Sequence, residues 1–433
     1  MKLWQKEDTQ TAAKTEQFTV GRDREFDLLL ARYDVMGSLA HTAMLQEVGL
    51  LSATDYADIK AGLEAIAAEI ASGDFRIDED TEDIHSQVEQ MLTQRIGEAG
   101  KMIHSGRSRN DQVALDIKLY LRDAVLAIKD EVGGLFDCLL TLSERFREVL
   151  MPGYTHLQVA MPSSFGLWFG AYAECLAEDT EMLAAAYAVI NKNPLGSGAG
   201  YGSSFPLDRE ATTTALGFRA MHYNAITAQM SRGRGEKMLS MALSCIGSTL
   251  GRLAMDVCLY NSQNFGFIRF PESLTTGSSI MPHKKNPDIF ELIRGKCNRI
   301  QALPNELSLL LTNLPSGYHR ELQLTKEILF PGIDSLRACI DILMLALPQA
   351  EVNTAILDDE RYRYIFSVEA VNELVKKGVP FRDAYRQVGK DIAENTFQYT
   401  GFTASKHTHE GSIGHLCNDR IREEWALMAR KFS

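Results

Sequence analysis

Residues 277–287 read GSSIMPHKKNP, and this stretch is the point from which the rest of the sequence is best interpreted. Positions 277–279 hold a glycine and two serines, whose small side chains let the backbone come close to a ligand and bring a hydroxyl within reach. Lys284 and Lys285 add positive charge to the same segment. The composition favours a loop that binds an anionic ligand.

A helix is predicted to begin directly after this loop. Asn286 is suited to the N-cap position and Pro287 to the first helical position. Asp288 and Glu291 would form an acidic first turn that matches the helix dipole, and the N-terminus of such a helix favours anions. Residue by residue, an ordinary surface loop before a capped helix explains the same pattern.

The string as a whole resembles GSxxMPxKxN, the signature of the fumarase/aspartase superfamily, with glycine, methionine, proline, lysine and asparagine in register. Members of that superfamily split a bond to an amine, amide or hydroxyl and release fumarate. The resemblance implies an all-α, three-domain fold in which a central bundle of long helices forms the core of a tetramer. It also implies a reaction on a small molecule that uses no cofactor and no metal.

Composition limits the classes of function. The chain has 433 residues, of which 45% are hydrophobic and 24% charged, and its net charge is −12. This acidic balance argues against a nucleic acid or an anionic membrane as partner, so an anionic substrate needs a local basic site. The first residues, MKLWQKEDTQ, lack a basic region followed by an apolar run, and we find no uninterrupted apolar stretch of membrane-spanning length. We expect a cytoplasmic protein that contacts no membrane.

Apolar residues recur at helical spacing through most of the chain. The pattern predicts helical segments at 23–73, with stops at Gly49 and Gly73, and at 232–261, 288–303, 325–347, 368–377 and 381–393. They are grouped into three domains: an N-terminal helical domain (1–107), a central bundle that carries the signature loop (108–355) and a small C-terminal helical domain (356–433).

Two further segments gather polar and basic side chains at a helix start. Residues 104–112, HSGRSRNDQ, can grip carboxylates, because arginine offers a planar fork of donors and serine and asparagine add neutral ones. Asn110 or Asp111 is also a suitable cap for the helix that follows. Residues 318–326, YHRELQLTK, place Gln323 and Lys326 on one face of a helix, although an exposed polar face explains this equally well.

Two histidines are candidates for chemistry. His85 follows an acidic run at a helix start, where a lone histidine is more often a packed or surface residue than a catalytic one. His156 lies in THLQ (155–158), where the adjacent threonine and nearby glutamine can tune an acid or base. Histidines 407, 409 and 415 with Cys417 fit no standard zinc spacing, so no metal site is predicted.

Three strings narrow the resemblance to one family. SGRSRNDQ (105–112), THLQ (155–158) and YHRELQLTK (318–326) are similar to segments of the argininosuccinate lyase family, which splits argininosuccinate into arginine and fumarate in the last step of arginine biosynthesis. Fumarases, aspartases and adenylosuccinate lyases carry a different motif at the first of these positions. The alternatives are another fumarate-releasing lyase, such as adenylosuccinate lyase, and a non-catalytic, crystallin-like structural protein.

The resemblance also implies roles for individual residues. Ser278 is the general base and His156 the general acid, although the reverse assignment is equally compatible with the sequence. Glu291 assists His156, and Lys284 stabilises the negative charge that develops during the reaction. The implied substrate ligands are Ser108, Arg109, Asn110, Thr155, Asn286, Tyr318, Gln323, Lys326 and His85. In the superfamily each active site is built from three subunits of a homotetramer.

The sequence departs from the family pattern near both ends. The usual N-terminal Trp-Gly-Gly-Arg-Phe string is reduced to KLW followed by QKED, and the usual Asn-Ala-Ser substrate segment is replaced by FTVGRD (18–23). Thr19 or Asp23 is therefore the candidate substrate contact there. IFSVEAVNELV (365–375) also departs, which affects domain contacts more than chemistry.

Overall fold

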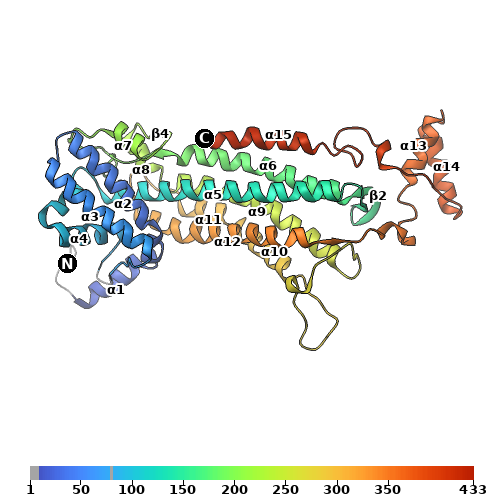
Figure 1. Ribbon diagram of the computed structural model, residues 1–433, viewed down its shortest axis with the longest axis horizontal. Helices are drawn as coiled ribbons and strands as arrows, with labels where there is room; N and C mark the ends of the chain where they lie inside the picture. The colour runs from blue at the N-terminus through green and yellow to red at the C-terminus, as the bar shows by residue number, and fades with distance from the viewer. Residues whose placement is uncertain (1–8, 79–80) are drawn as a thin grey trace.

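The computed structural model describes residues 9–78 and 81–433, and in them the protein is a long helical bundle with smaller helical groups at its two ends (Figure 1). Sheets within this part of the chain are all two-stranded, so the predicted all-α class is confirmed. The N-terminal group consists of α1 (Thr9–Val20), α2 (Asp23–Glu47), α3 (Ala53–Ser72), α4 (Ile84–Ile96) and the 3-10 helix η1 (Gly97–His104).

Local sequence explains the ends of α3. The Ser52 side chain accepts a hydrogen bond from the Asp55 amide at the N-terminus, and Gly73 ends the helix in a left-handed conformation, with φ of 80°. Gly49 and Gly73 are thus the stops that the sequence predicted. Apolar side chains of α2, α3 and α4 form a core of their own, which includes Leu45, Leu63 and Leu92.

The central bundle is organised around α5 (Arg109–Arg145), whose 37 residues span about 55 Å. The bundle also contains α6 (Phe165–Ile190), α9 (Arg234–Asn261), α10 (Asp288–Ile300), α11 (Leu303–Leu310) and α12 (Thr325–Ala346). Helix α5 packs against α6 and α12, and α9 packs against α6, α10 and α11. A continuous core that includes Leu139, Phe169 and Leu250 fills the space between these helices.

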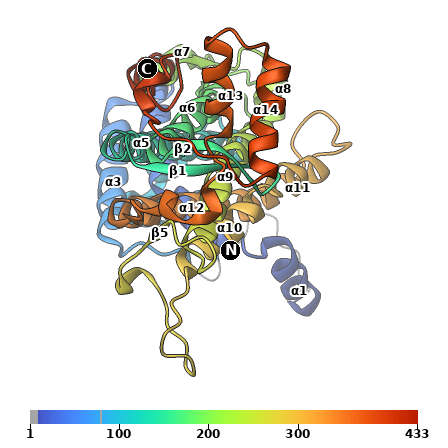
Figure 2. The ribbon, with the colours of Figure 1, turned by 90° about the vertical axis from the view of Figure 1, so that its right-hand side faces the viewer.

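Short elements connect the bundle helices. The first two strands form an antiparallel hairpin at the end of the bundle remote from α1 to α4 (Figures 1 and 2). It follows α5, and the next short helix, α7, lies at the opposite end. These elements are β1 (Leu150–Thr155), β2 (Gln158–Ser164), β3 (Lys192–Asn193), α7 (Arg209–Ala215), β4 (Ala220–Met221), α8 (Ala225–Met230), β5 (Ile268–Arg269) and β6 (Glu351–Val352).

The C-terminal region divides into two parts. Helices α13 (Ser367–Lys376) and α14 (Phe381–Ala393) pack on each other at the hairpin end. Helix α15 (Asn418–Ala429) instead returns along α6 and also contacts α5, because Asn418 donates to the Ser143 hydroxyl at 3.0 Å and Trp425 stacks on Phe136. Residues 418–429 thus pack on the bundle.

Both predicted helix caps need correction. Ser108, not Asn110 or Asp111, is the N-cap of α5, and Asp111 completes a capping box by accepting from the Ser108 amide at 2.8 Å. At α10 the N-cap residue is Pro287, which offers no side-chain hydrogen bond. Asn286 instead exchanges backbone hydrogen bonds with Thr276, and this bridge closes the base of the signature loop.

One stretch, Ala225–Asn261, is long and apolar enough to cross a membrane by length and composition alone. The sequence pattern predicted only a helix here, at residues 232–261. Half of its most apolar window is buried within this chain, and its main helix, α9, packs on four bundle helices, α6, α10, α11 and α12. A helix in the centre of a helical bundle is apolar on most sides because other helices cover it. Its composition can therefore match that of a membrane-spanning helix.

Candidate active site

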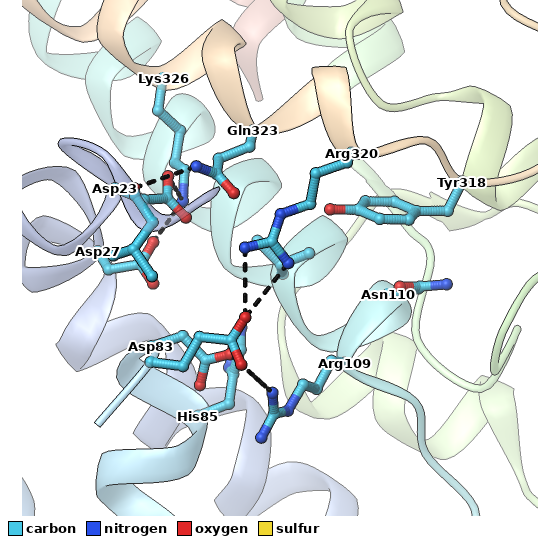
Figure 3. Close-up of a pocket in the computed structure, with 13 residues that line it drawn as sticks. Asp23, Asp27, Asp83, His85, Arg109, Asn110, Tyr318, Arg320, Gln323 and Lys326 are labelled. Atoms are coloured by element: carbon cyan, nitrogen blue, oxygen red, sulfur yellow. Dashed lines mark hydrogen bonds and ion pairs between the residues drawn. The ribbon is translucent and has the colours of Figure 1, made fainter. Parts of the chain in front are cut away.

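A pocket opens where the N-terminal helices meet the start of α5 and the residues before α12 (Figure 3). Its walls carry four acidic and four basic side chains together with neutral donors. Seven of the predicted or candidate site residues come together here from distant parts of the sequence. The lining residues are Val20, Asp23, Asp27, Glu82, Asp83, His85, Arg109, Asn110, Val113, Tyr318, Arg320, Gln323 and Lys326.

Lys326 lies at one side of the pocket and is almost completely buried. Its ammonium forms ion pairs with Asp27 and with Asp23, the latter at 2.6 Å. Burial alone would lower the pKa of Lys326, but the charges of these carboxylates raise it, so the side chain stays protonated. The candidate contact Asp23 is therefore joined to a predicted substrate ligand.

Gln323 lies beside Lys326, in the 3-10 helix η3 (Arg320–Leu324) rather than in α12 itself. Its amide donates to the backbone oxygens of Thr19 at 3.0 Å and Val20 at 3.2 Å. The segment before α12 and the end of α1 are thus held together at the pocket edge. Both predicted members of this pair, Gln323 and Lys326, face the N-terminal helices.

Two arginines share one carboxylate across the pocket mouth. Arg109 donates to Glu82 at 3.3 Å, and both terminal nitrogens of Arg320 donate to the other oxygen of Glu82 at 3.2 Å. Arg109 also donates to the Ser86 hydroxyl at 2.7 Å. Because a guanidinium presents several donors in a fork, two of them facing one point make a strong carboxylate site. Sequence reasoning missed Glu82, which sits in an acidic run that also reads as a solvated helix start.

His85 lines the same pocket, although its ring is nearly buried. Its Nδ1 lies 2.7 Å from Asp34 and 3.5 Å from Asp116. Burial alone would lower the pKa of His85, but the charges of Asp34, Asp116 and Asp83 raise it to about 9. The sequence offered no sign of Asp34 or Asp116, since both lie among apolar residues of long helices.

Three other predicted residues lie close to this pocket. Asn110 and Tyr318 line it, and both are partly buried. Ser108 does not line it, because its hydroxyl accepts from the Asn110 amide at 3.3 Å as the cap of α5. Ser108 thus caps α5 and does not line the pocket.

Thr155 and His156 lie at the tip of the β1–β2 hairpin, at the opposite end of α5. His156 and Leu157 form a two-residue turn with φ of 54° and 58°, a left-handed geometry that suits tight hairpins. Thr155 and His156, the two predicted site residues, are exposed. Next to the tip, the Tyr154 hydroxyl donates to that of Tyr362 at 3.2 Å, which ties the strand to the segment before α13.

The signature loop forms a third location and projects away from the bundle in both ribbon views (Figures 1 and 2). The Ser278 hydroxyl accepts from the amides of Ile280 at 3.3 Å and Met281 at 3.1 Å, so it lies in a nest of backbone donors. Lys284 is exposed on the loop, and Glu291 is exposed on the first turn of α10. Asn286 lies at the base of the loop.

The site residues therefore occupy three separate places in one chain. The pocket lies at the start of α5 and the hairpin lies beyond its end, a separation on the order of 50 Å along a rigid helix. A single bound molecule the size of a metabolite cannot touch both. Either the groups act separately, or different copies of the chain contribute them to one site.

A pocket of paired cations and carboxylates, a loop that holds a serine hydroxyl among backbone donors and a bundle of long helices together define a fumarase-type lyase. A family model described as lyase matches residues 6–302. The chain is 54% identical over 420 residues to the argininosuccinate lyase of Bacteroides thetaiotaomicron, which covers 97% of this chain and 94% of that protein. It is 39% identical to that of Thermotoga neapolitana, over 90% of this chain and 98% of that one. The chain belongs to the argininosuccinate lyase family, as its motifs predicted.

Solved structures show the same fold at low sequence identity. A variant of EDDS lyase with bound fumarate superposes with a TM-score of 0.78 at 21% identity, covering 96% of this chain and 90% of that one. The class II fumarase of Schistosoma mansoni has a TM-score of 0.71 at 16% identity, covering 94% and 91%. The predicted fumarase/aspartase-type fold is confirmed.

Proposed function

We propose that the protein cleaves argininosuccinate by carbon–nitrogen elimination and releases arginine and fumarate. The observation that carries this proposal is the mixed charge of the pocket, where Arg109 and Arg320 face Glu82, and Lys326 faces Asp23. Argininosuccinate has carboxylates as well as a guanidinium and an ammonium group, so a site for it needs both signs of charge. The family membership of the chain supports the same substrate.

The chemical difficulty is a proton on carbon. Its removal puts further negative charge next to a carboxylate, and pre-placed donors must stabilise that charge. We assign the proton transfers to Ser278 and His156, one as general base and the other as general acid. The backbone amides around Ser278 support the base role, because donors of this kind stabilise an alkoxide when the loop closes.

The remaining residues bind substrate or assist those two. Lys284 and Asn286 meet the negative charge on the intermediate, and Glu291 assists His156. The pocket residues hold the substrate through its charged and polar groups, with Thr155 adding a contact from the hairpin. The proposed pocket ligands are His85, Arg109, Asn110, Tyr318, Gln323 and Lys326, with Ser108 acting through the cap that orients Asn110.

The protein acts as a homotetramer in which each site draws on several subunits. The length of α5 supports this, because the pocket and the hairpin of one chain lie at opposite ends of the bundle. Large apolar side chains also remain exposed on bundle helices in the single chain, among them Leu292, Leu309 and Leu345. Such faces are typical of helices that pack against further copies.

Two further expectations belong to this proposal. The protein is cytoplasmic, in keeping with a substrate of intermediary metabolism. Domain limits of 1–107 and 108–355 stand as proposed, with α13 and α14 as the small C-terminal unit and residues 418–433 joined to the bundle. The packing of α15 on α6 supports that last change.

The test is fumarate release, followed by ultraviolet absorbance, with argininosuccinate and adenylosuccinate offered separately to the wild type and to Ser278→Ala. We expect cleavage of argininosuccinate only, and its loss in the variant with the tetramer intact. Preference for adenylosuccinate would overturn the substrate assignment. A folded tetramer that cleaves neither would favour a structural, crystallin-like protein.

A further inference from the structure

A buried charged triad next to the pocket consists of Asp34, His85 and Asp116, which come from α2, α4 and α5. All three side chains are at most 6% exposed. The two carboxylates approach the same ring nitrogen, with Nδ1 at 2.7 Å from Asp34 and 3.5 Å from Asp116. Two acidic groups behind one imidazole are an expensive arrangement, because each carboxylate loses its water. The arrangement therefore calls for an explanation.

A metal ion is the first explanation to consider, since these three residues form a possible ligand group. Metal–ligand bonds of about 2.0 Å in a tetrahedral site place neighbouring ligand atoms roughly 3.3 Å apart. The Nδ1 of His85 and the Asp34 oxygen are closer than this, at a hydrogen-bond distance. The Nδ1 of His85 and the Asp34 oxygen therefore share a proton and not a metal ion.

The charges around the ring favour a protonated His85. Asp34, Asp116 and Asp83 face it from three elements, while Arg107 and Arg109 supply the nearby positive charge and burial with these arginines lowers the pKa of His104. Burial and the charge of Asp34 raise the pKa of Asp116 well above its usual value. Asp116 also keeps an oxygen, Oδ2, that has no hydrogen-bond partner.

The orientation of the His85 ring determines which of its nitrogens can reach a bound molecule. Because Nδ1 is occupied by the two carboxylates, Nε2 is the nitrogen left for the pocket that His85 lines. Among the residues that the structure describes, Nε2 has no hydrogen-bond partner. Nε2–H is therefore the donor that His85 can offer to a molecule bound in the pocket.

We propose that Asp34 and Asp116 are positioning residues that keep His85 as a permanent imidazolium, whose Nε2–H binds a carboxylate of the ligand. The inference rests on the proposed function for the identity of that ligand. The inference adds Asp34 and Asp116 to the residues that the site needs, although neither touches the substrate. It also assigns His85 a fixed charge in place of an acid–base role near neutral pH.

Succinate, a dicarboxylate that cannot react, is the probe. Its dissociation constant is measured by titration calorimetry from pH 6 to pH 8.5 on the intact protein, which needs no turnover. For the wild type we expect a constant that varies little over this range, since His85 remains charged throughout. For Asp34→Asn we expect binding close to normal at pH 6 and weaker by about tenfold at pH 8.5, because the imidazole then titrates near its ordinary pKa of about 6.5.

Two more variants keep the result interpretable. Asp116→Asn is expected to shift the profile in the same direction by less, and it carries the test if Asp34→Asn fails to fold. Asp256→Asn removes a carboxylate that accepts hydrogen bonds from Trp168 and Tyr172 in the bundle, and it should leave the profile unchanged. This control separates a general loss of stability from an effect on the pocket.

Equal weakening of succinate binding at every pH in both Asp34→Asn and Asp116→Asn would overturn the proposal, because it would mark a purely structural role. Failure of the wild type to bind succinate would overturn it as well. If the pH profiles follow the expectation but no argininosuccinate is cleaved, the positioning role stands and the proposed function alone fails.

Discussion

Gln323 donates its side-chain amide to the backbone oxygen of Thr19 at 3.0 Å, joining residues 304 positions apart in the sequence. The segment that replaces the family's usual N-terminal substrate string is thereby attached to the segment before α12. Thr19 takes part through its main chain, and Asp23 through its ion pair with Lys326. The edge of the pocket therefore depends on contacts between residues 19–23 and residues 323–326.

Replacing Gln323 with alanine removes the donor to both Thr19 and Val20. We expect the KM for argininosuccinate to rise by about tenfold, with a smaller change in kcat, because the variant loses a proposed ligand and loosens the end of α1. Steady-state kinetics give the two constants, and limited proteolysis reports the release of α1. Gln301→Ala, on an exposed residue after α10, is the matched control. An unchanged KM would mean that this contact is not part of the site.

Asp111 joins the cap of α5 to the glycine-rich segment 194–204. Its oxygens accept from the amides of Ser108 at 2.8 Å, Gly196 at 3.0 Å and Gly198 at 2.9 Å. Asp111→Ala leaves three amides without this partner and should lower the free energy of unfolding by about 4 kcal/mol. Ser108→Ala, which removes only the cap hydroxyl, should cost about 1 kcal/mol. Urea denaturation at fixed protein concentration compares them, and equal losses would contradict this account.

The hairpin turn carries strain at Leu157, whose φ is 58° while its side chain is 72% exposed. Leu157→Gly should stabilise the protein by about 0.5 to 1 kcal/mol, because glycine adopts this conformation without a steric cost. Val159→Gly, within the extended strand β2, should destabilise it by a similar amount. Thermal unfolding measures both changes. Destabilisation by Leu157→Gly would show that its side chain makes contacts in the assembled protein.

His41 predicts a loss of stability in acid. Burial and the charge of Arg107 lower its pKa to about 3, and its Nε2 lies 2.8 Å from the Ser105 carbonyl oxygen. The unfolded chain binds a proton below a pKa of about 6.5 but the folded chain does not, so stability falls as pH decreases from 7 to 5, by about 2 kcal/mol for this residue.

The His41→Gln variant keeps a donor for Ser105 but cannot titrate, so its free energy of unfolding should depend less on pH by that amount. His283→Gln, on an exposed side chain, is the control. Denaturant unfolding at pH 7 and pH 5 makes the comparison. Identical slopes in the wild type and His41→Gln would show that folding does not change the pKa of His41.

The sequence predicted most reliably those features that depend only on residues close together in the chain. The helix stops at Gly49 and Gly73 and the family motifs at 277–287 and 318–326 depend on neighbouring residues. The N-cap of α5 was misplaced because Ser108, Asn110 and Asp111 are all good capping residues, and only the backbone path decides between them. The hairpin at residues 150–164 was not predicted, because a short strand pair carries a weak pattern beside long helices.

The tertiary partners could not be predicted at all. Asp34 and Asp116 lie in α2 and α5 among apolar residues, and no spacing rule connects either of them with His85. The separation of the pocket from the hairpin also depends on the straight path of α5. A sequence pattern names the groups that a site needs, but it does not tell which groups one chain can bring together.

The measurement that tests the central claim most directly combines two inactive variants. His156→Gln disables the hairpin and Asn110→Ala disables the pocket, which lie at opposite ends of one bundle. If one site takes these residues from different subunits, coexpression yields hybrids in which some sites carry neither substitution, and about a quarter of the wild-type activity should return. Asn110→Ala combined with Tyr318→Phe, both in one pocket, should restore none. Hybrids of the first pair that assemble and stay as inactive as their parents would contradict a site shared between subunits.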